Sequence, residues 1–198
     1  MPTALDTLYP DHLRTLCARA DQVLVRTGYD HLLIGAGLPP LKFLDDQDYP
    51  FIASPWFRHW LPLTDAPGSW IVHTPGSRPR LVFVQPRDYW HLVPQMPEAY
   101  WTREFDLSIV PSATAARAQL PGGHNAVIVA DAVAQGYPAD ANPADVLDAL
   151  NWQRSIKTPY ELELLREANR IAVRAHRAAE EAFRAGGSEL DTHLAYLA

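Results

Sequence analysis

Thr-Pro-Tyr-Glu at residues 158–161 is the stretch that decides how this chain is organised. It has the form of a capping box, with a hydroxyl at the N-cap, a proline at the first helical position and a carboxylate three residues after the cap. Alanines and leucines then recur three or four residues apart up to Phe183, charged residues fill the other faces, and two glycines follow at 186–187. The pattern predicts an amphipathic helix of about seven turns that begins at Pro159.

A second helix is predicted directly after the first. Ser-Glu-Leu-Asp at residues 188–191 repeats the capping box with aspartate in place of glutamate. Residues 192–198 contain no glycine, proline or basic last turn that would end this helix. We therefore expect the chain to be a piece of a longer protein, with one domain over residues 1–156 and the truncated start of a second over residues 157–198.

Composition excludes several classes of function. The chain of 198 residues is 47% hydrophobic and 20% charged, as in a soluble globular protein. A net charge of −6, without any run of lysine or arginine, argues against binding to nucleic acid. No apolar run of membrane-spanning length and no leader pattern occurs, so we expect no membrane segment and a cytoplasmic location. The single cysteine, Cys17, excludes an internal disulfide.

Residues 1–156 alternate between helical and strand patterns, which predicts an α/β domain. Tyr-Pro-Asp at 9–11 is expected to open a first helix that Gly28 ends. Strands are expected at 31–34, at 70–74 and 81–85 as a hairpin, and at 105–110. A short helix at 113–120 precedes the strand 126–130, which is apolar throughout and is therefore predicted to be central in the sheet. A further helix begins at Asn-Pro-Ala-Asp, residues 142–145.

The segment from Phe43 to Trp60 has an unusual composition, because three aspartates lie beside six aromatic rings. Asp45, Asp46 and Asp48 do not have calcium-loop spacing, and no histidine pair is near. They fit two other interpretations. Aspartates before a proline are commonly turn formers and caps, whereas a carboxylate held against aromatic faces suits a ligand with an ammonium group.

No catalytic constellation is recognisable from the residues alone. The eight histidines are spread through the chain without metal-ligand spacing, and no nucleophile elbow occurs. His73, inside a predicted strand, is expected to be a satisfied structural histidine rather than a ligand. Asp-Tyr-Trp-His at 88–91 follows a strand end, where either a functional loop or a packed corner would have this composition.

Five short blocks, in order through nearly the whole chain, are more specific together than any single motif. They are Phe-Leu-Asp-Asp at 43–46 with Tyr-Pro-Phe at 49–51, the prolines and aromatics at 55–62, Asp-Tyr-Trp-His at 88–91, the segment 157–168, and His-Arg-Ala-Ala-Glu-Glu-Ala-Phe at 176–183. These blocks closely resemble bacterial Xaa-Pro dipeptidase (prolidase), of the creatinase/pita-bread metallopeptidase family.

The resemblance implies a fold and an activity. It implies a creatinase-like N-terminal domain with a mixed central sheet flanked by helices, followed here by the first helices of a truncated pita-bread domain. In this family the second domain holds two manganese ions and hydrolyses dipeptides with a C-terminal proline, and some members also hydrolyse organophosphate esters. The metal ligands of the family lie beyond residue 198, so the resemblance assigns no metal ligand and no catalytic residue to this chain.

Two residues acquire an expected role from the resemblance. In dimeric members the N-terminal domain reaches the active site of the partner subunit. Asp46 matches the acid that closes the pocket near the free amino group of the substrate, and Trp90 is a second candidate for the same lid. Asp45, its neighbour, is the residue that could be mistaken for Asp46. The alternative hypothesis is a non-catalytic interaction or dimerisation module. In either case we expect the 198-residue piece alone to be inactive.

Overall fold

The computed structural model describes residues 4–87, 89, 93, 98–129 and 141–198. The chain divides into two compact units, Met1–Ile156 and Lys157–Ala198. That the second unit is the start of a pita-bread domain stays a prediction.

The first unit opens with α1 (Ala4–Thr27), which starts earlier than predicted. The sequence placed the helix start at residues 9–11, but Pro10 lies inside the helix. Proline has no N–H with which to bond the carbonyl of Asp6 four residues earlier. That carbonyl instead accepts from the Arg103 guanidinium, with Nη2 at 3.5 Å. Because this partner is 97 residues away in the chain, local sequence gives no sign that the proline is tolerated.

A five-stranded mixed sheet forms the centre of the first unit, with the order β4-β3-β2-β1-β5. β1 pairs antiparallel with β2 and parallel with β5, while β3 pairs antiparallel with β2 and parallel with β4. The predicted hairpin and the mixed α/β sheet flanked by helices are thereby confirmed. The strands are β1 (His31–Gly35), β2 (Trp70–His73), β3 (Arg80–Val84), β4 (Asp106–Val110) and β5 (Asn125–Ile128).

β5 lies at an edge of the sheet, so the prediction that this apolar strand is central was wrong. Asn142 covers part of its free edge. The Asn142 backbone N–H donates to the Val127 carbonyl at 2.7 Å, and its side chain bonds both the N–H and the carbonyl of Val129, at 3.0 and 3.1 Å. An edge strand can be apolar when another segment satisfies its backbone groups.

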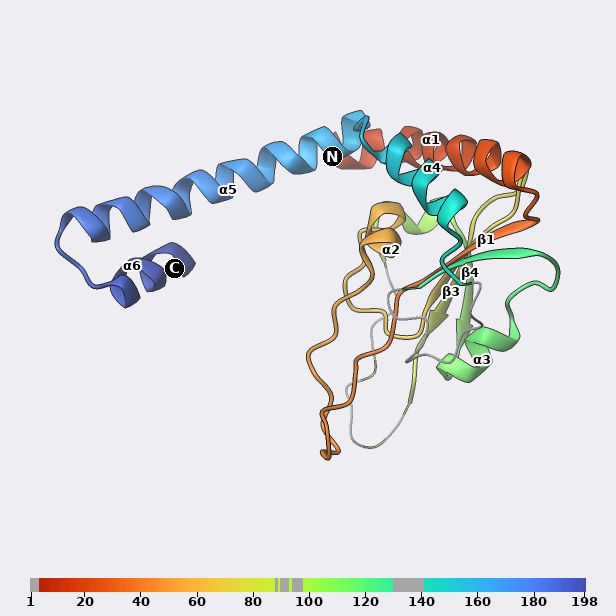
Figure 1. The fold of residues 1–198 in the computed structure, drawn as a ribbon, viewed down its shortest axis with the longest axis horizontal. Helices are drawn as coiled ribbons and strands as arrows, with labels where there is room; N and C mark the ends of the chain where they lie inside the picture. Colours follow the sequence, from red (N-terminus) through yellow and green to blue (C-terminus); the bar gives the residue numbers. More distant parts are fainter. Residues whose placement is uncertain (1–3, 88, 90–92, 94–97, 130–140) are drawn as a thin grey trace. The chain divides into compact units, whose positions relative to one another are not determined.

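Helices cover both faces of the sheet (Figure 1). α3 (Ala113–Ala118) packs over one face, where its Ala116 joins a buried cluster of residues from β1, β2, β3 and β4. α1 and α2 (Pro55–Trp60) contact β1, and α4 (Ala144–Arg154) packs beside α1. A one-turn 3-10 helix, η1 (Thr102–Glu104), precedes β4. The apolar stripe of α1, including Leu13, Leu16, Val23 and Leu24, is buried as its spacing predicts.

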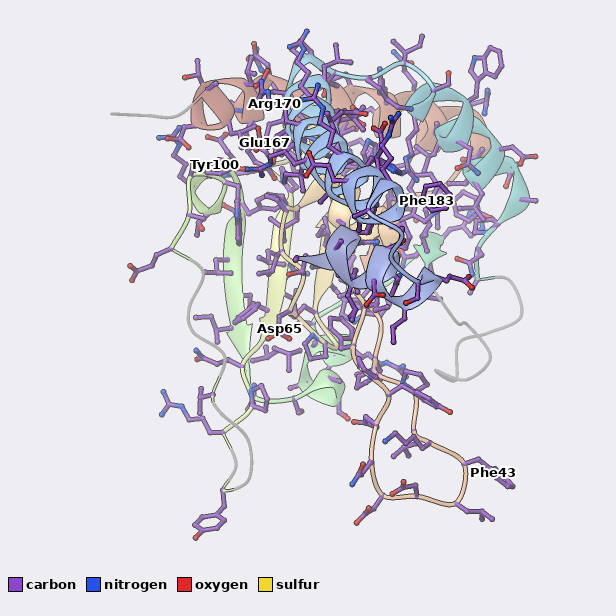
Figure 2. All side chains as sticks on the ribbon, turned by 90° about the vertical axis from the view of Figure 1, so that its left-hand side faces the viewer. Phe43, Asp65, Tyr100, Glu167, Arg170 and Phe183 are labelled. Atoms are coloured by element: carbon purple, nitrogen blue, oxygen red, sulfur yellow. The ribbon has the colours of Figure 1, made fainter. Side chains whose placement is uncertain are left out.

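The second unit consists of α5 (Pro159–Arg184) and α6 (Glu189–Leu197), which contact each other. Both predicted capping boxes are present: Thr158 and Glu161 cap α5, and Ser188 and Asp191 cap α6. His176 of α5 lies edge-on to Tyr196 of α6, with ring centroids 5.2 Å apart. Figure 2 labels Glu167 and Arg170 of α5, which form an ion pair on the helix surface.

Candidate functional site

The aspartate-rich segment forms a long loop between β1 and α2. The loop extends away from the sheet of the first unit, with Phe43 at its far end (Figures 1 and 2). An isolated antiparallel bridge pairs Leu41 with Asp48, and the Lys42 N–H donates to the Gln47 carbonyl at 2.9 Å. These contacts make a two-stranded stem, so residues 43–46 form a short tip. We call residues 41–48 the tip hairpin.

Hydrogen bonds inside the tip hairpin hold its turn in a defined conformation. The Asp45 N–H donates to the Lys42 carbonyl at 3.2 Å, which closes a four-residue turn. Leu44, at the third position of that turn, has a left-handed backbone with φ of 57°. The Asp45 side chain accepts from the Gln47 N–H, with Oδ1 at 3.1 Å, and Lys42 Nζ donates to Gln47 Oε1 at the same distance.

The three aspartates therefore have different environments. The Asp45 carboxylate is engaged as a turn former, which is the interpretation the sequence offered for all three. Asp48 lies in the stem. Asp46 lies in the tip, is exposed, and its carboxylate forms no hydrogen bond or ion pair to any other described residue. Two of the three loop aspartates, Asp46 and Asp48, have carboxylates without a partner among the described residues, and Asp46 is the one at the end of the loop.

Large apolar side chains accompany Asp46 at the tip. Phe43 and Leu44 are 90% and 92% exposed, and Tyr49, at the base of the hairpin, is 54% exposed. An exposed pair of this size next to a charge suits contact with a second surface, because burial of both side chains would then remove apolar area from water. The sequence-based interpretation of a cation site stays a prediction, since the aromatic faces and the carboxylate would need that second surface to enclose a ligand.

Trp90, the other candidate lid residue, lies outside the described residues, as do Asp88 and His91. Tyr89, from the same block, is described and is 89% exposed. Neither the functional-loop nor the packed-corner interpretation of residues 88–91 is tested for the block as a whole.

His73 is a buried structural histidine, as the sequence predicts, but only one of its two ring nitrogens has a partner among the described residues. Its side chain is 1% exposed, and Nε2 donates to Asp21 Oδ1 at 2.7 Å. Nδ1 is buried without a hydrogen-bond partner among the described residues. Burial lowers the pKa of His73 below its ordinary value, and the hydrogen bond and charge of Asp21 oppose that shift only in part. The pair is therefore a neutral imidazole held by a carboxylate near neutral pH.

Sequence reasoning did not identify Asp21 as the partner of His73. The available signal was the position of Asp21 on α1, four residues after Cys17 and three before the buried Leu24. A carboxylate beside the buried stripe of a helix needs a polar partner. Cys17, Asp21 and His73 line an open groove of about 560 Å³ between α1 and the β2–β3 turn. Burial and the nearby Asp21 charge raise the pKa of the Cys17 thiol to about 12, which makes it a poor nucleophile.

The described part of the chain offers neither a metal-binding cluster nor a membrane-spanning helix. Across residues 4–129 and 141–198, apart from the gaps near residue 90, no group of three or more histidine, cysteine, aspartate or glutamate side chains could hold a metal ion. None of the helices in the same residues is both long enough and apolar enough to cross a membrane.

The overall fold has a counterpart among solved structures. A histidine-to-alanine variant of Escherichia coli aminopeptidase P superposes with a TM-score of 0.50 at 19% sequence identity, over 86% of this chain and 44% of that one. At this identity the similarity defines the fold alone. The shared fold is the mixed sheet flanked by helices described above.

Similarity in sequence defines the family. Residues 7–152 match the family described as Xaa-Pro dipeptidase, N-terminal domain, and the chain belongs to it. It is 51% identical to Xaa-Pro dipeptidase of Xanthomonas campestris pv. campestris over 195 residues, 98% of this chain and 44% of that protein. The corresponding enzyme of Stenotrophomonas maltophilia is 47% identical over 96% of this chain and 43% of its own length. The chain thus spans less than half the length of these relatives.

Proposed function

We propose that this chain is the N-terminal part of a metal-dependent Xaa-Pro dipeptidase, in which it supplies a lid and a dimerisation surface. The observation that carries the proposal is the family match over residues 7–152. The tip hairpin supports the lid role, because it holds an available carboxylate and two exposed apolar side chains away from the sheet. In this role Asp46 would contribute to the active site of the partner subunit, together with Trp90.

Asp46 would recognise the free amino group of a dipeptide. A carboxylate binds an ammonium group through charge-assisted hydrogen bonds, which are about twice as strong as those between neutral groups. A carboxylate that ends the pocket would also exclude longer peptides, whose next residue would occupy its position. Selection for short substrates would then have two sources: attraction between the Asp46 carboxylate and the ammonium group of a dipeptide, and exclusion of the additional residue of a longer peptide.

The cofactor would be two manganese ions, and we propose that residues outside this chain hold them. The described residues do not fit a metal site, because they contain no cluster of three metal-binding side chains. The sequence-based expectation is that the two ions supply an activated hydroxide for attack on the peptide bond. Hydrolysis of organophosphate esters as a side activity and a cytoplasmic homodimer are further parts of the proposal.

The test compares Asp46→Ala with Asp48→Ala in the full-length enzyme. The control also removes an exposed carboxylate from the tip hairpin, but from its stem. Loss of a hydrogen bond to a charged group costs about 1.5–3 kcal/mol. We therefore expect Asp46→Ala to lower kcat/KM for a Xaa-Pro dipeptide about 10- to 100-fold and to lower the preference for the dipeptide over a tripeptide extended at its amino end, Yaa-Xaa-Pro. Asp48→Ala should change both values less than threefold.

Two results would contradict the proposal. If Asp46→Ala retained wild-type kinetics and length selection, Asp46 would not be part of the site. If the 198-residue chain alone, supplied with manganese, hydrolysed a Xaa-Pro dipeptide, the assignment of the hydrolytic machinery to residues outside the chain would be wrong.

A further inference from the structure

We infer that Asp45 is a positioning residue: its carboxylate holds the Gln47 N–H after Asp46, its own backbone N–H holds the turn before Asp46, and together they aim the Asp46 carboxylate. This inference rests on the proposed function of Asp46. It assigns to Asp45 a role that differs from that of its neighbour, although both residues are exposed aspartates.

Asp45 forms hydrogen bonds that fix the backbone before and after Asp46. Asp45 Oδ1 accepts from the Gln47 N–H at 3.1 Å, so this hydrogen bond spans Asp46. On the other side, the Asp45 N–H donates to the Lys42 carbonyl at 3.2 Å. Because the backbone of Asp46 lies between two tethered residues, it has fewer conformations available than an open loop would give it.

Leu44 shows why the turn needs such a tether. Its φ of 57° is a left-handed conformation that a leucine adopts only at a cost, and glycine or asparagine is the usual residue at this position of the turn. Leu44 is 92% exposed, so packing does not hold it in place. The hydrogen bonds of Lys42, Asp45 and Gln47 are the contacts that hold the strained turn together in the described residues.

The adjacent carboxylates of Asp45 and Asp46 therefore have different roles. Asp45 acts through its oxygen as a hydrogen-bond acceptor, and asparagine can supply the same Oδ1 atom. Asp46 acts through its charge, which asparagine cannot supply. The same substitution should therefore have opposite outcomes at the two positions.

The experiment uses the full-length enzyme with Asp45→Ala, Asp45→Asn, Asp46→Ala and Asp46→Asn. We expect Asp45→Ala to raise KM for a Xaa-Pro dipeptide three- to tenfold with kcat changed less than twofold, and to reduce the preference for the dipeptide over the Yaa-Xaa-Pro tripeptide. Asp45→Asn should restore both values to within twofold of wild type, whereas Asp46→Asn should remain as impaired as Asp46→Ala. A second readout is amide hydrogen exchange at Gln47 in the 198-residue chain, which should accelerate at least threefold in Asp45→Ala and not in Asp45→Asn.

Each other outcome overturns the inference. If Asp45→Asn is as impaired as Asp45→Ala, the charge of Asp45 matters rather than its acceptor oxygen. If Asp45→Ala behaves as wild type while Asp46→Ala is impaired, the inference fails and the proposed function stands. If both Asp46 variants behave as wild type, the proposed function fails and Asp45 has no site to position.

Discussion

The buried pair His73–Asp21 predicts an acid-sensitive step in the stability of the first unit. The imidazole is 1% exposed and burial lowers its pKa below the ordinary value of 6.5. The unfolded chain, in which the pKa is not lowered, then binds a proton more readily than the folded chain as pH falls. The full stability is present above about pH 6.5 and is progressively lost below it.

Because only one group takes up a proton, the loss of unfolding free energy on acidification has an upper limit. A single group that is protonated only in the unfolded state reduces the free energy of unfolding by at most about 1.4 kcal/mol between pH 7.5 and pH 5.5. The hydrogen bond to Asp21 raises the folded pKa and so keeps the loss below that limit. The variant His73→Gln keeps an N–H donor for Asp21 but cannot titrate, so it should remove this part of the pH dependence.

Urea unfolding of the 198-residue chain, followed by tryptophan fluorescence, measures the effect directly. All six tryptophans lie between residues 56 and 152, so the signal reports on the first unit. The difference in unfolding free energy between pH 7.5 and pH 5.5 should be smaller in His73→Gln than in wild type. His193→Gln, which removes an exposed histidine of α6, is the matched control and should leave that difference unchanged. If His73→Gln has the same acid dependence as wild type, His73 is not the group responsible.

Two further predictions concern the interior of the first unit. In Gly35→Ala the added Cβ would lie 3.0 Å from Val129 Cγ1 and 3.1 Å from the Trp70 ring, so we expect a loss of about 1–3 kcal/mol in unfolding free energy. The control is Gly122→Ala, whose added Cβ meets nothing within 4 Å. Equal losses in the two variants would contradict the argument. Because the pKa of Cys17 is raised to about 12, its thiol should react slowly with an aromatic disulfide reagent. At pH 8 we expect the reaction to be at least about tenfold slower in the folded chain than in urea. Equal rates would show that the thiol is accessible and ionised in the folded chain.

Local sequence predicted those features of the fold that local physics controls. The capping boxes at residues 158 and 188, the hairpin of β2 and β3, and the start of α4 after Pro143 follow from residue types within a few positions. The two errors both involve distant partners. Pro10 is accommodated in α1 where Arg103 serves the freed carbonyl of Asp6, and β5 lies at an edge that Asn142 covers.

The sequence drew attention to the loop that carries the candidate site, but it did not predict which of the three aspartates has a carboxylate free to bind a ligand. Three aspartates among aromatic residues marked this segment as unusual from composition alone, and composition left both a turn-forming role and a cation site open. Which carboxylate remains available depends on the bond between Asp45 Oδ1 and the Gln47 N–H, and that bond depends on the left-handed turn at Leu44. Leucine is not a residue from which a left-handed turn is predicted. The resemblance to the family selects Asp46, and its role stays a prediction.

The tip hairpin adds little to the stability of the domain that carries it. Phe43 and Leu44 leave almost all of their surface in water, so they contribute almost no burial energy to the sheet or its helices. The left-handed Leu44 costs the folded state about 1–2 kcal/mol in addition. His73, by contrast, is a polar group in the interior that receives a partner from another element, as stability requires. Backbone strain and exposed apolar surface at one end of a loop are typical of a segment that binds a partner, and they agree with the lid role that we propose for the tip hairpin.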